Sequence, residues 1–228
     1  MAGRRQRAAG GRTVGGLSFS QRELRDLLIA WLALGLAFTF FLEREFRRIV
    51  FGQFGGLSGA EIASTFAVSL LTVGVGFLLH ELAHKVVAVR FGQIAAFQAD
   101  YRMLGFAVLG GLVGFLFAAP GAVVHRGRLT AKQHGLIAVA GPVTNLALAV
   151  VFLVPFVAAI LTSTGGFLWE VARMGLQINL LLAGFNMLPF GPLDGRTVRE
   201  WSTPVFLAVA VPSILLGIVG LLFLPQMP

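Results

Sequence analysis

The chain has 228 residues, of which 57% are hydrophobic and only 12% charged. A mean hydropathy of +0.85 excludes an ordinary soluble domain and predicts an all-α polytopic membrane protein. Cysteine is absent, so disulfides and thiolate ligands are excluded, and any metal ion must bind His, Asp or Glu. The net charge of +8 fits loops beside membrane spans better than nucleic-acid binding, so we expect no nucleic-acid partner.

The chain order predicts a short tail followed by one membrane domain. Residues 1–26 are expected to form a basic cytoplasmic tail, with the Gly- and Arg-rich first 20 residues disordered. Residues 27–228 are expected to form the integral-membrane domain, with five to six transmembrane segments. Six uncharged runs are long enough to enter or cross a bilayer: 27–42, 62–79, 103–124, 135–161, 174–190 and 205–224.

Basic residues predict how these segments are oriented. Residues 1–26 hold six Arg, and 85–102 and 125–132 hold three Lys or Arg each, which predicts that all three stretches lie in the cytoplasm of a multi-pass cell-membrane protein. The Gly-rich run 103–124 would then begin and end on the same side, as a re-entrant segment does. A full crossing stays open, because 22 uncharged residues are enough to span a bilayer.

The run that begins at Ile62 keeps helical character to about Val89, and its last turns contain "HELAH". His80 and His84 are four residues apart, so both imidazoles lie on one helix face and can bind one metal ion. Glu81 lies beside them, where it can take a proton from metal-bound water. Two histidines and one further protein ligand, with the fourth position left for water, are typical of zinc hydrolases.

The third ligand has few candidates in the sequence. Asp194, in "FNMLPFGPLDGR", ends another apolar run, as the histidines do, and Pro189 and Pro192 would break the helix before it. An ordinary turn at a helix end would also explain "PLDG". The remaining candidates lie in loops or near helix ends and are Asp100, His125, His134 and Glu170.

Three motifs together resemble one protein family. "HELAH" late in one span, "AGPVTN" opening a later one and "FNMLPFGPLDG" closing the next resemble the site-2 proteases, which are intramembrane zinc metalloproteases. The resemblance covers about residues 62–199. It implies that one zinc ion binds His80, His84 and Asp194, with Glu81 as the base. It also implies that Asn186 handles the substrate carbonyl, where a carboxamide can donate to the oxyanion; a hydrogen bond between helices is the alternative role.

Two further features are candidates for substrate binding. Asn145 in "AGPVTN" is one, although a structural contact between helices is the favoured interpretation. Gly110 and Gly111 lie in the re-entrant run, which could supply an edge or cavity for an unwound substrate. That run is longer and more apolar than the short membrane-inserted strand or hairpin usual in the family.

The sequence therefore predicts an intramembrane zinc metalloendopeptidase that cleaves membrane-anchored proteins within or beside the bilayer. Its expected partners are transmembrane protein substrates and the lipid bilayer, and no oligomeric state is indicated.

A catalytically inactive regulator of the same family is an alternative function, but it would have no need of a general base. A membrane zinc transporter is another, but it should show polar residues along several spans. Prenyl-protein proteases share the first motif but are expected to use a downstream Glu ligand.

Overall fold

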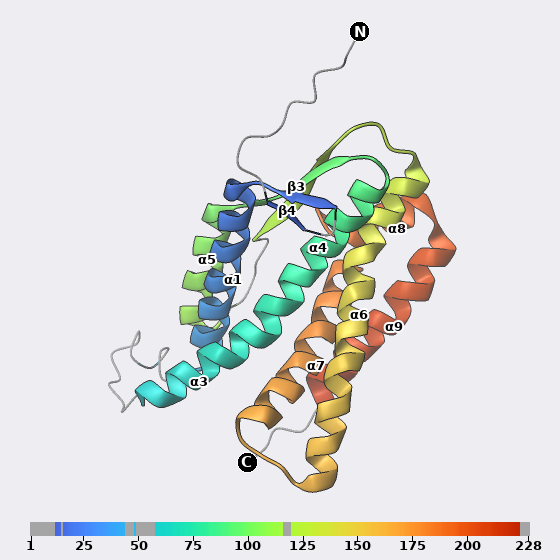
Figure 1. The fold of residues 1–228 in the computed structure, drawn as a ribbon. Helices are drawn as coiled ribbons and strands as arrows, with labels where there is room; N and C mark the ends of the chain where they lie inside the picture. Colours follow the sequence, from blue (N-terminus) through green and yellow to red (C-terminus); the bar gives the residue numbers. More distant parts are fainter. Residues whose placement is uncertain (1–11, 15, 44–47, 49–57, 116–119, 224–228) are drawn as a thin grey trace.

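The structure is a computed structural model that describes residues 12–14, 16–43, 48, 58–115 and 120–223. Long helices form a bundle, and a small sheet lies across one end of it (Figure 1). The helices are α1 (Gln21–Leu42), α3 (Gly59–Ser69), α4 (Val75–Arg90), α5 (Tyr101–Val113), α6 (Ala131–Thr162), α7 (Phe167–Asn186), α8 (Asp194–Trp201) and α9 (Thr203–Phe223). The strands form two antiparallel pairs: β1 (Arg12–Val14) with β2 (Leu17–Phe19), and β3 (Ile94–Ala99) with β4 (Gly121–Arg126).

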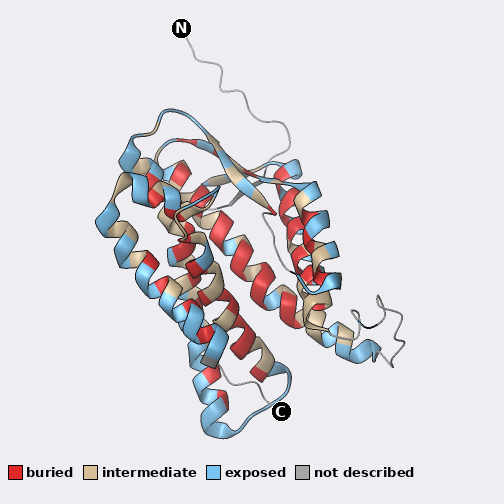
Figure 2. Ribbon diagram, turned by 180° about the vertical axis from the view of Figure 1, so that it is seen from behind, coloured by how far each residue is buried: buried red, intermediate tan, exposed pale blue. Residues whose placement is uncertain are grey.

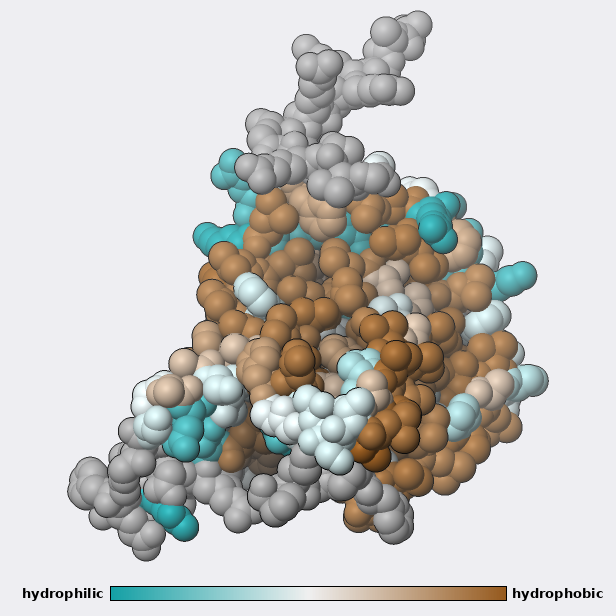
Figure 3. All heavy atoms as spheres, turned by 60° about the horizontal axis from the view of Figure 1, so that its bottom comes forward, coloured by the Kyte–Doolittle hydropathy of each residue, from teal (hydrophilic) through white to brown (hydrophobic). Residues whose placement is uncertain are grey.

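Within the described residues, four helical stretches are long and apolar enough to cross a membrane: Gln21–Leu42, Gly59–Arg90, Ala131–Thr162 and Thr203–Leu222. Helix α7 is also 20 residues long but carries Glu170 and Arg173, which make it less apolar. Residues with buried side chains face the interior of the bundle, and exposed residues lie on the outside (Figure 2). The outside is largely hydrophobic on the face shown in Figure 3. The chain is therefore an all-α polytopic membrane protein, as the sequence predicts.

Helices α3 and α4 form one continuous helix through a π-helical turn at Leu70–Gly74. Trp31 on α1 holds this turn, because its Nε1 donates to the Leu70 carbonyl at 3.0 Å. Its indole also covers Gly74, where an added Cβ would lie 2.3 Å from the ring. The helix expected from Ile62 to about Val89 is present, with one local change of pitch.

The run 103–124 does not cross the membrane. Strands β3 and β4 pair Ala99 with Gly121, so the chain leaves and returns at the same place. Between them, α5 has 13 residues and is about 20 Å long, which is too short for a bilayer core of about 30 Å. A full crossing is therefore wrong, and the return to the same side that the sequence predicts is confirmed, while entry of this segment into the membrane stays a prediction. The run is divided into a helix, which packs along α1, and a strand.

The N-terminal tail is ordered where it meets the bundle. Residues 1–11 lie outside the described residues, but 12–14 and 17–19 form the β1–β2 hairpin. Ser20 then begins α1, because its Oγ accepts the N–H of Glu23 at 3.1 Å. The predicted disorder is wrong for this part of the tail, because tertiary contacts to α4, described below, fix it.

The re-entrant topology predicts which positions a membrane-impermeant thiol reagent can reach. The chain has no cysteine, so single cysteines can be introduced without a background signal. Arg102→Cys and Arg128→Cys should be labelled from the same side of the membrane, and Glu61→Cys, at the other end of the α3–α4 helix, from the opposite side. Labelling of Arg102→Cys and Arg128→Cys from opposite sides would contradict the topology.

Candidate metal centre

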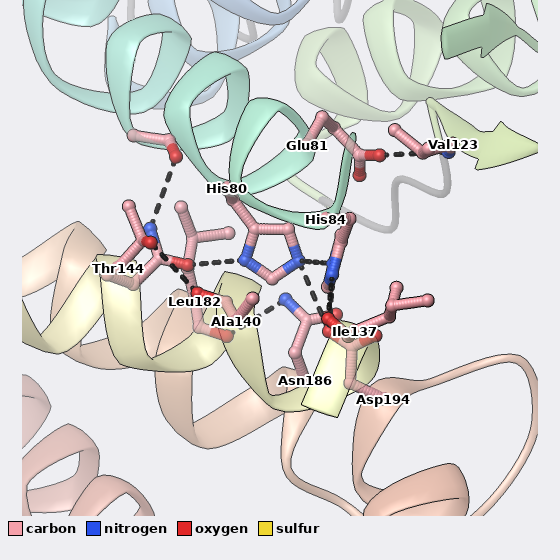
Figure 4. Close-up of polar contacts among 12 residues, drawn as sticks. His80, Glu81, His84, Val123, Ile137, Ala140, Thr144, Leu182, Asn186 and Asp194 are labelled. Atoms are coloured by element: carbon pink, nitrogen blue, oxygen red, sulfur yellow. Dashed lines mark hydrogen bonds and ion pairs between the residues drawn. The ribbon is translucent and has the colours of Figure 1, made fainter. Parts of the chain in front are cut away.

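Three side chains meet where α4, α6 and the start of α8 approach one another (Figure 4). His80 and His84 lie one helical turn apart on α4, with their Nε2 atoms 3.0 Å apart. Asp194 is the first residue of α8, and its Oδ2 lies 3.2 Å from the Nε2 of His80 and 3.4 Å from that of His84. The structure thus brings together the three residues that the sequence suggested as ligands, from segments more than 100 residues apart.

The imidazole of His84 is oriented by the backbone of α6. Its Nδ1 lies 2.8 Å from the carbonyl oxygen of Ile137, which can only accept a hydrogen bond. The ring proton is therefore on Nδ1, and Nε2 presents a lone pair toward Asp194. A histidine that binds a metal ion commonly has such a partner on its other nitrogen.

Asn145 on α6 orients His80 in the same way. Its amide nitrogen donates to the carbonyl of Gly76 at 3.2 Å and to Oδ1 of Asn179 at 2.9 Å. Its own Oδ1 is left as an acceptor, 2.6 Å from the Nδ1 of His80. Asn145 is fully buried behind the imidazole, so it contacts the predicted ligand and is closed off from substrate. Asn179, a polar residue within the apolar α7, was not among the sequence candidates.

The donor set fits a zinc ion. Two nitrogen lone pairs and a carboxylate oxygen converge, and Asp194 Oδ2 is buried without a hydrogen-bond partner among the described residues. Such groups repel one another unless a proton or a metal cation lies between them. Ligands of a tetrahedral zinc ion are about 3.3 Å apart, which is close to the three separations of 3.0, 3.2 and 3.4 Å in the structure. His80, His84 and Asp194 would hold the ion and leave one position open.

Gly141 explains the glycine of "AGPVTN". A Cβ on this residue would lie 2.5 Å from the ring of His80 and 2.6 Å from that of His84. Any side chain here would push the imidazoles out of place, so the backbone of α6 can approach them only at a glycine. The sequence carried this signal, but its meaning depends on the contact between α4 and α6.

Glu81 is directed away from the three ligands, toward β4 (Figure 4). Its Oε2 accepts the N–H of Val123 at 3.1 Å, and its side chain is buried. It borders a cavity of about 1420 Å³ that is also lined by the three ligands, by Asn186 and by β4. Nδ2 of Asn186 donates to the carbonyl of Leu182 at 2.9 Å.

Gly110 and Gly111 lie elsewhere. A Cβ on Gly111 would be 2.2 Å from the backbone oxygen of Ala37, so this glycine allows α5 to pack closely on α1. The carbonyl of Gly110 accepts the N–H of Phe115 at 2.8 Å, where α5 ends. Neither glycine lines the cavity, and the structure gives both a role in packing.

The other candidates for the third ligand have other partners. The Asp100 side chain accepts the N–H groups that begin α5, and Glu170 pairs with Arg173 at 2.6 Å. The rings of His125 and His134 contact each other edge to face, with centroids 5.2 Å apart. Partial burial, together with this neighbour, lowers the pKa of His125. Neither histidine is part of the cluster formed by His80, His84 and Asp194.

Metal analysis of purified protein tests the centre directly. We expect about one zinc ion per chain in the wild type and loss of zinc in His80→Ala and Asp194→Ala, because each removes one of three ligands. Arg196→Gln is a matched control, since Arg196 lies on the same short helix but pairs with Glu200 at the surface. Equal zinc in Asp194→Ala and wild type would show that another residue is the third ligand.

Asn145→Leu should keep the fold of α6 but weaken zinc binding about 10- to 100-fold, because the Nδ1 proton of His80 loses its acceptor. A competition titration with a chelator measures the affinity. Unchanged affinity would show that Asn145 does not control the orientation of His80.

Comparisons with known proteins agree with this centre. No protein-family model matches the chain, and no solved structure matches it. The chain is 40% identical over 199 residues to the Methanocaldococcus jannaschii protein named "Putative zinc metalloprotease MJ0611", an alignment that covers 86% of this chain and 93% of the relative. It is 35% identical to "Putative zinc metalloprotease YwhC" of Bacillus subtilis, over 59% of this chain and 68% of that protein. It is 36% identical to "Putative zinc metalloprotease Rip3" of Mycobacterium tuberculosis, over 59% of this chain but only 30% of that protein. Given the near full-length similarity to the Methanocaldococcus jannaschii protein, the chain belongs to the same family of zinc metalloproteases.

Proposed function

We propose that this chain is an intramembrane zinc metalloendopeptidase of the site-2 protease type, which cleaves membrane-anchored proteins within or beside the bilayer. The observation that supports this most strongly is the cavity among membrane helices that joins His80, His84 and Asp194 to Glu81. Zinc bound there would polarise the scissile carbonyl and lower the pKa of a coordinated water toward neutrality.

Glu81 is the general base in this proposal. The N–H of Val123 binds Oε2 and fixes the plane of the carboxylate. No hydrogen bond to Oε1 is formed by the described residues, so this oxygen can take the proton from the attacking water. The same oxygen then returns the proton to the leaving amine nitrogen, which completes hydrolysis of the peptide bond.

Asn186 is the proposed donor to the oxyanion. One hydrogen of its amide is used for the Leu182 carbonyl on the same helix, which fixes the side chain. The second hydrogen stays available to an oxygen in the cavity that Asn186 lines. A donor held in place before the reaction stabilises developing negative charge without reorganisation.

Strand β4 is the proposed contact for the substrate backbone. Its residues from Gly121 to His125 line the cavity, and on the edge that is not paired with β3 the N–H of Val123 donates to Glu81. A helical substrate keeps its carbonyls in hydrogen bonds and must unwind before attack, and an unwound segment can pair with the rest of this strand edge. The edge predicted for the re-entrant segment is thus assigned to β4, and Gly110 and Gly111 are not needed for it.

The proposed orientation places the N-terminus, β3, β4 and α8 on the cytoplasmic side of the cell membrane. Figure 1 shows the start of α1, the end of α4 and the small sheet at the same end of the bundle. Arg90, Arg126, Arg128 and Lys132 belong to this end. An excess of basic residues is typical of cytoplasmic loops, so the metal centre would lie toward the cytoplasmic side.

Glu81→Gln tests the proposed function. We expect this variant to keep zinc but to lose cleavage by about 100-fold or more, because the amide cannot accept the proton. The assay uses proteoliposomes with a panel of tagged single-pass transmembrane helices, and mass spectrometry identifies the products. Glu200→Gln, at the exposed surface of α8, is the control.

The same assay separates the alternatives. Wild-type protein that holds zinc but cleaves no helix in the panel would favour the inactive regulator. Zinc flux into the vesicles would favour the transporter, and cleavage restricted to prenylated peptides would favour the prenyl-protein proteases.

Asn186→Ala should lower kcat about 100-fold or more, as loss of one oxyanion donor does, while zinc content stays at the wild-type level. Single-turnover cleavage of the best helix in the panel measures this. Wild-type kcat in Asn186→Ala would show that the residue serves only as a contact within α7.

A further inference from the structure

A buried charge pair lies next to the metal centre but takes no part in the proposed chemistry. Lys85, which follows His84, is 1% exposed, and Glu23 on α1 is 2% exposed. Lys85 Nζ donates to the two carboxylate oxygens of Glu23, at 2.6 and 2.7 Å, and to the Ser18 carbonyl at 2.7 Å. It also lies 3.7 Å from the ring centroid of Phe19. Burial of two charges has a desolvation cost that their attraction often fails to offset, so stability alone does not explain the pair.

Glu23 makes one further contact, to the sheet. Its Oε1 accepts the N–H of Phe97 on β3 at 3.0 Å. Asp26, about one turn further along α1, accepts the N–H of Ala99 through Oδ2 at 3.4 Å. Carboxylates on α1 therefore satisfy N–H groups on the edge of β3 that does not face β4, and this fixes the strand against the helix.

Phe97 and Val123 are directly paired in the register of β3 and β4. The N–H of each points away from the partner strand, as in a non-hydrogen-bonded antiparallel pair. Phe97 donates to Glu23 on one edge of the sheet, and Val123 donates to Glu81 on the other. The two strands are thus held between two carboxylates.

Helix α4 connects the two sides. Glu81 and Lys85 are four residues apart and therefore share one face of the helix. Glu81 reaches β4 directly, and Lys85 reaches β3 through Glu23. The contacts form a closed ring that runs from Glu81 through Val123, Phe97, Glu23 and Lys85 back to α4.

We propose that Glu23 is a positioning residue for Glu81. By accepting the N–H of Phe97 while bound to Lys85, it fixes the strand pair relative to α4. This sets the direction of the Val123 N–H that holds the carboxylate of Glu81. The catalytic part of this proposal rests on the proposed function, but the ring of contacts can be tested without a substrate.

Two matched double variants isolate the hydrogen bond from the charge. Glu23→Gln with Lys85→Met and Glu23→Met with Lys85→Met both remove the two charges, so neither leaves an unpaired buried charge. Gln and Met have similar length, but only Gln keeps an oxygen that can accept the N–H of Phe97. Arg196→Met with Glu200→Gln removes an exposed ion pair and serves as the control.

Residue-resolved amide hydrogen exchange of the zinc-loaded protein in nanodiscs is the first measurement. The amides of Phe97 and Val123 should exchange at least about tenfold faster in the Glu23→Met pair than in the Glu23→Gln pair. Zinc content should be unchanged in both. Equal exchange in the two variants, whether slow or fast, would overturn the proposal. If the Glu23→Met double variant does not fold, amide exchange in the wild-type protein is the test. Fast exchange of the wild-type Phe97 amide would overturn the proposal.

Cleavage in proteoliposomes is the second measurement. The Glu23→Met pair should lose at least about tenfold in kcat, and the Glu23→Gln pair should stay near wild type, since an acceptor is restored without the charge. Wild-type kcat in both pairs would overturn the positioning role and leave the proposed function standing. No cleavage by the wild type would remove the proposed function, while the exchange measurement would still decide whether the ring of contacts holds the strands.

Discussion

The convergence of three metal-ligating atoms is the constraint on which the rest of the structure depends. His80, His84 and Asp194 direct their Nε2 and Oδ2 atoms at one another over 3.0 to 3.4 Å, in a place where little water can separate them. A metal ion between them would be attracted to all three, more strongly here than at a wet surface. The fold therefore has to hold these three atoms at the spacing that the ion needs.

Two rigid elements, helix α6 and strand β4, fix the side chains of the centre. The backbone of α6 supplies the Ile137 carbonyl, the space at Gly141 and the Asn145 side chain, so one helix orients both imidazoles. The base is fixed separately, by the N–H of Val123 on β4. Metal ligands and base can therefore be disturbed independently, although His80 and Glu81 are adjacent in the chain.

The sequence could predict the parts of the centre that depend on local pattern. The long apolar runs gave the helices, the spacing of His80 and His84 gave two ligands on one face, and the position of Asp194 at the end of a run made it the best third candidate. The charge of the loops gave the return of the re-entrant segment. These features follow from helical periodicity and from the free-energy cost of polar groups in a bilayer.

The remaining features depend on contacts between distant segments. Nothing in the sequence around Asn145 shows that its side chain faces His80, and the order of strand β2 follows from the contacts of Lys85 with Ser18 and Phe19. The division of the run 103–124 into α5 and β4 also escaped prediction, because that run is uniformly apolar and its boundaries are set by pairing with β3. Short apolar stretches do not distinguish strand from helix without their tertiary partners.

The π-helical turn at Leu70–Gly74 has a consequence for the face on which the histidines lie. A π-turn holds one residue more than an α-turn, so everything after it is rotated by about 100° relative to an uninterrupted helix. The azimuth of His80 and His84 is therefore set about two turns earlier, where Trp31 binds the Leu70 carbonyl. If the same residues formed an uninterrupted α-helix, "HELAH" would turn away from Asp194, whereas a single deletion within this turn would restore a regular α-turn and keep the motif on its present face. In this chain, the pitch of the helix before the motif matters as much as the motif.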